Sequence, residues 1–371
     1  MEVHHVRKRG DCVSKSPDVM VVLGTRPEAI KLASVVRALR RQEVNVSVLT
    51  TGQQGALLDD ALQELGLVSQ YKLHPTESDR SLASSTSRIL KDISGVLVET
   101  GPRLVVVQGD TTSTFCGAMS SFLNMIPVAH VEAGLRTYNM KAPYPEEGYR
   151  QLVSRIARWH FAPTSLAVEN LVGEGVPSDR IFHVGNTFVD DLGDVHRAVK
   201  EMSEPTILVT LHRRENAAKR LVEICRGIMS FLDDNKQYRA VVVLHPNPAS
   251  SLVLRKTLGQ HSQVKLVAAL SRADFLSLLR QSACVVTDSG GVQEEAFVFD
   301  IPLVIARETT ERPEVLAGQA GFAGWTESEI KASIEEILRE PAIRRSTRGW
   351  EEYGAGKASE RIASVLRAFL R

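Results

Sequence analysis

The 371-residue sequence has little of what several functional classes require. Its four cysteines, Cys12, Cys116, Cys225 and Cys284, form no CxxC pair, so the usual zinc and redox motifs are absent. No apolar run approaches the length that a membrane-spanning helix needs. The GxGxxG nicotinamide fingerprint is missing, which argues against a dehydrogenase. A formal net charge of +1 gives no general attraction to nucleic acid.

What remains is the composition of an ordinary globular protein, 43% hydrophobic and 24% charged. At roughly 100–200 residues per domain, the length predicts two domains. Cys116 and Cys284 lie in apolar runs and are expected to be buried thiols, as in a reducing cytoplasm. The basic N-terminus has no apolar signal-peptide core, and we expect residues 1–17 to be a disordered leader.

From residue 18 the chain alternates short apolar runs with amphipathic helical patterns. Strands are predicted in the first half at 19–23, 46–49, 104–107 and 127–131. The pattern then starts again, with strands predicted at 206–210, 240–244, 264–268, 283–287 and 302–305. This βαβα order predicts parallel sheets with helices on both faces.

We therefore expect an α/β fold of two Rossmann-like domains that face each other across a cleft. The first should span 18–184 and carry acid–base groups, and the second should span 185–353 and bind an anion. The segment 180–187 is expected to be the hinge region, and the run 151–161 a helix. A final helix within 354–371 should pack back on the first domain.

Three carboxylates are expected at one edge of the first sheet. Asp110 and Glu132 each follow a predicted strand, and Glu146 begins a predicted helix. Because the carboxyl ends of parallel strands form the ligand crevice, the three should meet there. Paired carboxylates on opposite faces of a bound sugar can remove and return a proton. They could instead be metal ligands, but no DxD or histidine cluster supports this, and we expect no metal.

The sequence GTRPE at 24–28 joins a strand to a helix. Thr25 and Glu28 have the spacing of a capping box, and Arg26 could add a forked phosphate donor. Exposed N–H groups at a helix start favour anions. A well-capped helix with no ligand is an equal alternative.

The sequence DSGGVQEE at 288–295 repeats this device in the second half. Ser289 stands where a capping residue would, and Gly290 and Gly291 allow a diphosphate to approach the backbone closely. Glu295 could accept hydrogen bonds from ribose hydroxyls. The alternative is a glycine-rich turn with a capping serine.

Three potential cations follow the strand predicted at 206–210. The sequence HRREN at 212–216 begins with His212, which the strand places at the sheet edge. These residues suggest a phosphate or leaving-group site, and a solvated charge run is the alternative. His245 ends another predicted strand and is expected to be structural.

Together the motifs resemble the non-hydrolysing UDP-N-acetylglucosamine 2-epimerases over roughly residues 19–361. The matching segments are GTRPEAIK, QGDTTST, HVEAGLRT, PYPEEGYRQL, VGNTFVD, LVTLHRREN, TDSGGVQEEA and TERPE. The resemblance implies a GT-B architecture, a homodimer, no added cofactor, and interconversion of UDP-GlcNAc and UDP-ManNAc. UDP would leave by C1–O cleavage as the C2 proton is removed, and re-addition would complete the inversion.

The resemblance also implies site residues. The catalytic set would be Asp110, Glu132, Glu146 and His212, with His212 stabilising the leaving diphosphate and the identity of the C2 base left open. The UDP-sugar set would be Arg26, Lys31, Leu270, Phe275, Ser289, Gly290, Gly291, Glu295 and Arg312. A second, regulatory site would involve Gln53, Gln54 and Arg80. Because Gln54 and Ser81 depart from the family pattern, activation by UDP-GlcNAc is expected to be weak or absent.

Three other functions remain alternatives from the sequence alone. A hydrolysing 2-epimerase would release ManNAc and UDP. A GT-B glycosyltransferase would share the UDP grip, and a non-catalytic sensor would not need all four catalytic positions. Cell-envelope polysaccharide, teichoic-acid and natural-product pathways all need ManNAc, and the sequence does not distinguish them. No membrane or nucleic-acid partner is expected.

Overall fold

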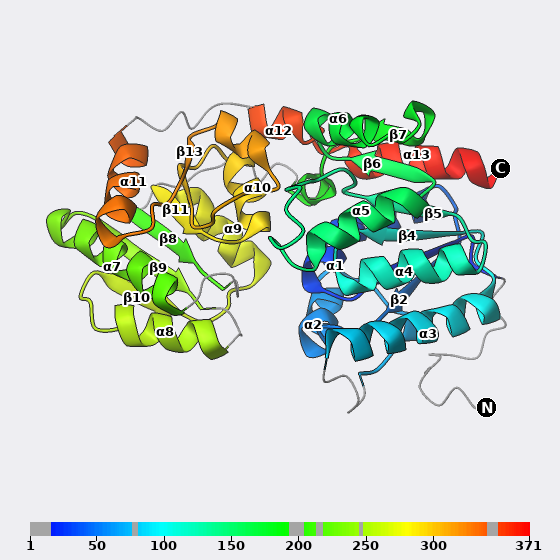
Figure 1. Ribbon diagram of the computed structural model, residues 1–371, viewed down its shortest axis with the longest axis horizontal. Helices are drawn as coiled ribbons and strands as arrows, with labels where there is room; N and C mark the ends of the chain where they lie inside the picture. Colours follow the sequence, from blue (N-terminus) through cyan, green and yellow to red (C-terminus); the bar gives the residue numbers. More distant parts are fainter. Residues whose placement is uncertain (1–15, 76–80, 193–203, 213–217, 245–247, 340–347) are drawn as a thin grey trace. The chain divides into compact units, whose positions relative to one another are not determined.

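The computed structural model describes residues 16–75, 81–192, 204–212, 218–244, 248–339 and 348–371 (Figure 1). Residues 1–15 of the predicted leader therefore lie outside the described part. The chain divides into two compact units. The first comprises Met1–Gly193 and Glu352–Arg371, and the second comprises Asp194–Glu351.

The first unit is built on a seven-stranded parallel sheet of order β3-β2-β1-β4-β5-β6-β7. The strands are β1 (Val19–Leu23), β2 (Val46–Thr50), β3 (Tyr71–Lys72), β4 (Leu104–Gln108), β5 (Val128–Val131), β6 (Trp159–Ala162) and β7 (Ile181–His183). The helices are α1 (Arg26–Arg41), α2 (Ala56–Glu64), α3 (Leu82–Thr100), α4 (Thr112–Leu123), α5 (Glu146–Ile156), α6 (Ser165–Gly173) and α13 (Ala358–Leu370), with 3-10 turns η1 (Ser178–Arg180) and η2 (Thr187–Asp191). Strand order reverses direction between β1 and β4, which makes their carboxyl ends the switch point of the sheet.

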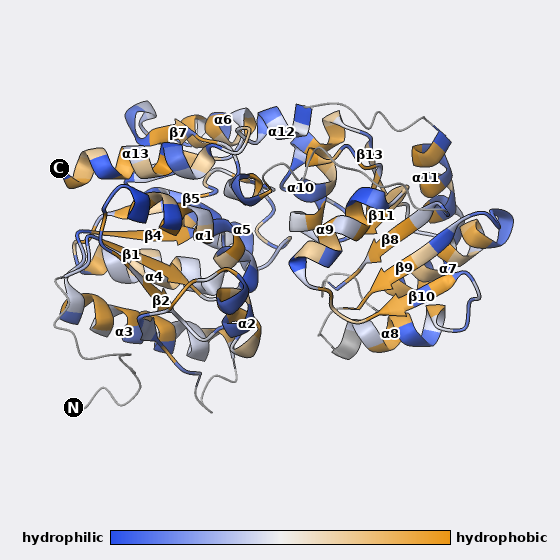
Figure 2. Cartoon of the chain, turned by 180° about the vertical axis from the view of Figure 1, so that it is seen from behind, coloured by the Kyte–Doolittle hydropathy of each residue, from blue (hydrophilic) through white to orange (hydrophobic). Residues whose placement is uncertain are grey.

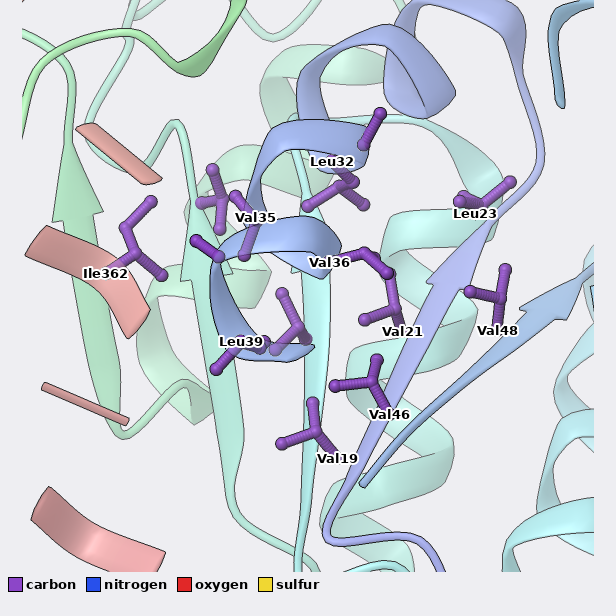
Figure 3. Close-up of a cluster of buried hydrophobic side chains, with 14 of the residues drawn as sticks. Val19, Val21, Leu23, Leu32, Val35, Val36, Leu39, Val46, Val48 and Ile362 are labelled. Carbon is purple, nitrogen blue, oxygen red and sulfur yellow. The ribbon is translucent and has the colours of Figure 1, made fainter. Parts of the chain in front are cut away.

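Strand β1 shows why apolar runs form the centre of this sheet. Its odd-numbered side chains, such as Val19 and Val21, pack in one core with α1 and α13 (Figure 3). Its even-numbered side chains, Met20 and Val22, belong to the core on the other face with α3 and α4. A strand buried on both faces needs apolar residues at every position, since side chains alternate between faces.

The C-terminal helix α13 packs back on α1, as the sequence predicted. Its residues Ile362, Ala363 and Leu366 are fully buried in the core that contains α1. Asp190 accepts hydrogen bonds from the backbone N–H groups of Ala358 (3.1 Å) and Ser359 (2.5 Å) at the start of the helix. A residue far away in sequence therefore caps α13.

The second unit repeats the architecture with a six-stranded parallel sheet of order β10-β9-β8-β11-β12-β13. Its strands are β8 (Thr206–Thr210), β9 (Arg239–Val243), β10 (Val264–Val267), β11 (Cys284–Thr287), β12 (Leu303–Ile305) and β13 (Ala320–Phe322). Its helices are α7 (Ala218–Asp234), α8 (Pro248–Leu258), α9 (Arg272–Gln281), α10 (Gly290–Val298), α11 (Glu327–Arg339) and α12 (Arg348–Glu352), with the 3-10 turn η4 (Pro313–Ala317). Figure 2 shows that most strand residues of both sheets are hydrophobic. The switch point lies between β8 and β11.

Two sequence interpretations were wrong at the level of elements. The run 151–161 is not one helix, because α5 ends at Ile156 and Trp159–Ala162 forms β6 between β5 and β7. Ala157 already has extended backbone angles, so the chain turns into the sheet there. The predicted hinge segment contributes Ile181–His183 as strand β7, at the edge of the first sheet. None of the helices in the described ranges has the length and apolarity that crossing a bilayer would demand.

Candidate active site

Glu132 lies at the carboxyl end of β5 in an unusual backbone conformation. Its φ is +63°, a left-handed value that side chains other than glycine rarely adopt. The residue is 9% exposed, and its carboxylate accepts hydrogen bonds from Lys31 and from the amide of Gln108 (2.8 Å). Strained backbone persists only where surrounding structure holds it, and such positions cluster at functional sites.

The turn after Glu132 needs glycine for two reasons. Gly134 has φ +91°, and a Cβ atom there would lie 2.2 Å from the carbonyl oxygen of Ala167. Its own carbonyl accepts a hydrogen bond from the side-chain amide of Asn170 (2.9 Å). Helix α6 therefore packs directly on the turn that aims Glu132.

Asp110 meets the first turns of α5. It follows Gly109 after β4, and its carboxylate forms a 2.5 Å ion pair with Arg150. Arg150 lies one helical turn after Glu146, the first residue of α5, so both project from the same side of the helix. The structure thus brings Asp110 and Glu146 to one place, on neighbouring elements of the same unit as Glu132.

The contacts of Glu147, next to Glu146, indicate a structural role. It is fully buried and accepts hydrogen bonds from the backbone N–H groups of Thr137 and Tyr138 and from Arg150 and Gln151. Burial alone would raise the pKa of Glu147, but these hydrogen bonds and the Arg150 charge outweigh it, so the pKa is lowered. The buried carboxylate therefore holds the loop before α5 in place.

The GTRPE turn is a closed helix cap. Glu28 is buried and accepts hydrogen bonds from the backbone N–H groups of Gly24 and Thr25, both at 2.7 Å. It also accepts from the hydroxyls of Thr111 (2.6 Å) and Thr114 (2.9 Å), across the switch point. Burial raises the pKa of Glu28, and these hydrogen bonds work in the opposite direction. The predicted capping box is confirmed, and the N–H groups of Gly24 and Thr25 are occupied rather than available to an anion.

The residues expected at a regulatory site also bind the starts of helices. The side-chain oxygen of Gln54 accepts from the backbone N–H of Arg26 (2.8 Å), and that of Gln53 accepts from Ser113. Ser81 caps α3 through the backbone N–H of Ser84 (3.1 Å). Arg80 lies outside the described residues, so the predicted site is seen only in part.

Lys31 and Arg26, both expected to contact UDP, project from α1 in the first unit. Lys31 forms an ion pair with Glu132, which is a predicted catalytic carboxylate. Arg26 is partly exposed and lies 3.9 Å from the carboxylate of Glu64. The other seven residues of the predicted UDP set belong to the second unit.

His212 lies directly beyond β8, at the switch point of the second sheet. Its backbone N–H donates to both carboxylate oxygens of Asp288, each at 3.0 Å. Its ring Nδ1 lies 3.2 Å from Oδ1 of the same carboxylate. Asp288 is fully buried, whereas the His212 side chain is 29% exposed. The remaining cations of the HRREN motif, and His245, lie outside the described residues.

The two glycines at the start of α10 have different surroundings. A Cβ atom at Gly290 would lie 2.5 Å from Nη1 of Arg312, so the protein's own guanidinium fills that space. Arg312 is buried between the carboxylates of Glu294 and Glu311. A Cβ atom at Gly291 would have no atom within 4 Å outside its own stretch of helix, so this side of the backbone is open to approach among the described residues.

Ser289 occupies the N-cap position of α10, but its side chain makes no capping hydrogen bond. The predicted capping role is therefore wrong. Glu295 in α10 pairs with Arg272 in α9 at 3.2 Å, which places the first turn of α9 against α10. Leu270 and Phe275, both partly exposed, flank this turn. All seven members of the predicted UDP set in the second unit thus lie around the starts of α9 and α10.

Sequence reasoning missed several residues that hold this arrangement. Gln108, Arg150, Asp288 and Arg272 each bond to a predicted site residue. Gln108 and Asp288 carried a signal, because each is polar at the end of a buried apolar strand. In the described ranges no three His, Cys, Asp or Glu side chains are grouped to hold a metal ion.

Two doubly wound parallel sheets, each with polar side chains at its switch point, define a GT-B-like α/β protein. The family model for UDP-N-acetylglucosamine 2-epimerase matches residues 37–367. A UDP-N-acetylglucosamine 2-epimerase of Bacillus subtilis is 37% identical over 362 residues, covering 95% of this chain and 95% of that protein. The chain belongs to the UDP-N-acetylglucosamine 2-epimerase family, as its motifs predicted.

Solved structures agree with this assignment. The Neisseria meningitidis UDP-GlcNAc 2-epimerase bound to UDP-GlcNAc has a TM-score of 0.87 at 33% identity, covering 94% of this chain and 99% of that one. The Methanocaldococcus jannaschii enzyme in complex with UDP-GlcNAc and UDP has a TM-score of 0.82 at 31% identity, covering 94% and 99%. The likeness therefore extends over nearly the whole chain.

Proposed function

We propose that this protein interconverts UDP-GlcNAc and UDP-ManNAc by inverting the configuration at C2. The observation that carries the proposal is the placement of the four predicted catalytic side chains. Asp110, Glu132 and Glu146 lie at the carboxyl edge of the first sheet, and His212 lies at that of the second. In open α/β sheets these edges are where ligands bind.

The chemistry divides between the units. A carboxylate of the first unit takes the C2 proton, and the electron pair of the C2–H bond forms the C1–C2 double bond. At the same time the C1–O bond breaks, and its electron pair goes to the β-phosphate oxygen of UDP. The product pair is a 2-acetamidoglucal and UDP. Re-addition of UDP at C1, with proton delivery to the opposite face of C2, completes the inversion. The second unit binds UDP through the open backbone at Gly291 and the groups around α9 and α10.

Deuterium incorporation tests the proposal. The protein is incubated with UDP-GlcNAc in heavy water containing EDTA, and the products are followed by NMR. We expect UDP-ManNAc with deuterium at C2, and deuterium at C2 of recovered UDP-GlcNAc. Conversion without deuterium would contradict the elimination, and free ManNAc would indicate a hydrolysing enzyme. Activity that requires magnesium would contradict the metal-free reaction.

We also propose that the protein is a homodimer that pairs through the ends of α3 and α4. Asn124 donates to Ser94 (2.8 Å), which joins the C-terminal halves of the two helices. Around this joint Val98, Phe122 and Met125 are 72%, 52% and 91% exposed. Large apolar side chains exposed together are typical of an interaction surface.

Sedimentation velocity tests the dimer. The wild-type protein should sediment as a dimer, and Phe122→Glu combined with Met125→Lys should sediment as a monomer. Leu252→Glu, at another exposed apolar residue on α8, should leave the dimer intact. A monomeric wild type would refute the proposal.

We further propose a cytoplasmic location. Cys116, Cys225 and Cys284 are free and buried, and burial raises the pKa of each thiol to about 12. Unpaired cysteines are typical of proteins from reducing compartments. Fractionation of cells that express the protein should recover it with cytoplasmic markers, and recovery with secreted markers would contradict this.

A further inference from the structure

The ends of β8 and β11 are held together by polar groups that the proposed reaction has not yet used. The two strands are neighbours in the sheet (Figure 1), and their register pairs Thr210 with Thr287. The hydroxyls of these threonines lie 2.6 Å apart, and that of Thr287 accepts from the backbone N–H of Ser289 (3.0 Å). The backbone N–H of Asp288 donates to the carbonyl of Thr210 (3.3 Å). These hydrogen bonds hold Asp288 at the end of β11, where its carboxylate contacts His212.

Three contacts join Asp288 to His212. The backbone N–H of His212 lies 3.0 Å from each carboxylate oxygen, and ring Nδ1 lies 3.2 Å from Oδ1. An ionised carboxylate can only accept hydrogen bonds, so Nδ1 must carry a proton in this contact. The other ring nitrogen, Nε2, belongs to a side chain that is 29% exposed.

We propose that Asp288 is a positioning residue for His212, an inference that rests on the proposed function. Its buried carboxylate fixes the direction of the imidazole and keeps the proton on Nδ1. In the reacting complex, with both ring nitrogens protonated, Nε2–H donates a hydrogen bond to the β-phosphate oxygen as the C1–O bond breaks. The electron pair of that bond goes to the oxygen, and the Nε2 proton stays on the ring. Aspartate orients histidine in the same way in hydrolase triads.

The geometry separates this role from a purely structural one. If Asp288 only joined two strand ends, its two bonds to the His212 backbone would suffice and the ring would be indifferent to it. Because the carboxylate also contacts Nδ1, Asp288 affects which ring nitrogen carries a proton. A test must therefore read the ring itself, and not stability or rate alone.

Nitrogen-15 NMR of histidine-labelled protein reads the ring without substrate. His212→Asn identifies the His212 signals. In the wild type we expect a protonated Nδ1, and in Asp288→Asn we expect Nδ1 to lose its proton, because the asparagine amide can donate to Nδ1. The same substitution at exposed Asp233 should leave the His212 signals unchanged. A wild-type ring protonated only on Nε2, or no change in Asp288→Asn, would overturn the proposal.

Kinetics supply the second test. Asp288→Asn should lower kcat, and the double variant with His212→Asn should be no slower than His212→Asn alone, since Asp288 acts through the ring. A further loss in the double variant would show that Asp288 acts independently. If the wild type does not epimerise, the proposed function fails, whereas the NMR result still decides the Asp288–His212 contact. If Asp288→Asn does not fold, the wild-type spectrum decides alone.

Discussion

At the scale of single residues, Glu132 combines strain, burial and polar contacts. Its left-handed backbone is held by Gly134 packing on α6, and its carboxylate faces Lys31 and Gln108. The Glu147 carboxylate differs, because it accepts hydrogen bonds from two loop N–H groups and two side chains. The glutamate with the strained backbone is therefore the better candidate for proton transfer.

Glu132→Gln should lower kcat by about 10²–10⁴, the usual contribution of general acid–base catalysis. UDP affinity should change little, because seven of the nine predicted UDP residues belong to the other unit. Steady-state kinetics and calorimetry measure the two effects separately. Glu169→Gln, on the exposed side of α6, is the control and should retain full activity. Loss of UDP binding in Glu132→Gln with kcat preserved would reverse the assignment of the units.

A second residue-scale prediction concerns activation by UDP-GlcNAc. Gln54 and Gln53 already bond to the first residues of α1 and α4, and Ser81 caps α3. We expect epimerisation of pure UDP-ManNAc to start with little or no lag. Progress curves with and without added UDP-GlcNAc measure this. A strict requirement for added UDP-GlcNAc would show that the predicted weak regulation is wrong.

At the scale of elements, the strands buried on both faces were predictable and the edge of the first sheet was not. Val19–Leu23 and Thr206–Thr210 could be predicted as strands because they are largely apolar. Once such strands are predicted, a polar residue that follows one, as Glu132 follows β5, can be placed at the carboxyl edge of a sheet. The Trp159–Ala162 strand mixes aromatic and polar residues directly after a helix, and only pairing with β5 and β7 makes it a strand. Likewise, contacts such as Asp288 to His212 depend on β8 lying beside β11, which chain order alone does not show.

The capping of α13 by Asp190 gives an element-scale prediction. Asp190→Ala leaves two backbone N–H groups at the helix start without their acceptor. The free energy of unfolding should fall by about 1–2 kcal/mol, the usual cost of losing a helix cap. Asp191→Ala is the matched control, since Asp191 forms a partly exposed pair with Arg37 worth at most about 1 kcal/mol. Urea unfolding compares them, and an equal loss in both variants would contradict the capping role.

At the scale of the whole molecule, the first sheet contains two histidines that cannot easily be charged. His130 in β5 and His160 in β6 are paired neighbours and are almost fully buried. Burial lowers the pKa of His130 to about 3, helped by His160 and Arg136 and opposed by Asp110 and a hydrogen bond to the carbonyl of Gly109. Burial lowers the pKa of His160 to about 4, helped by Arg136 and Arg180 and opposed by Glu174.

These depressed pKa values predict an acid-sensitive first unit. Above the ordinary histidine pKa of 6.5 both side chains are neutral in the folded and unfolded states, so their stability contribution is complete. As pH falls below 6.5, the two histidines bind protons in the unfolded chain but remain neutral in the folded chain. Each histidine should then cost about 2 kcal/mol between about pH 7.5 and 5. Glu28, whose pKa burial raises, acts in the opposite sense, so the comparison must be made against variants.

Urea unfolding at several pH values, followed by Trp159 fluorescence after Trp325 and Trp350 are replaced by Phe, measures this dependence. In His130→Gln combined with His160→Gln the loss of stability between about pH 7.5 and 5 should be smaller by about 4 kcal/mol, whatever the absolute stability of the variant. His183→Gln, at an exposed position of β7, should retain the wild-type slope. A double variant with the wild-type slope would mean that other groups set the acid sensitivity of this unit.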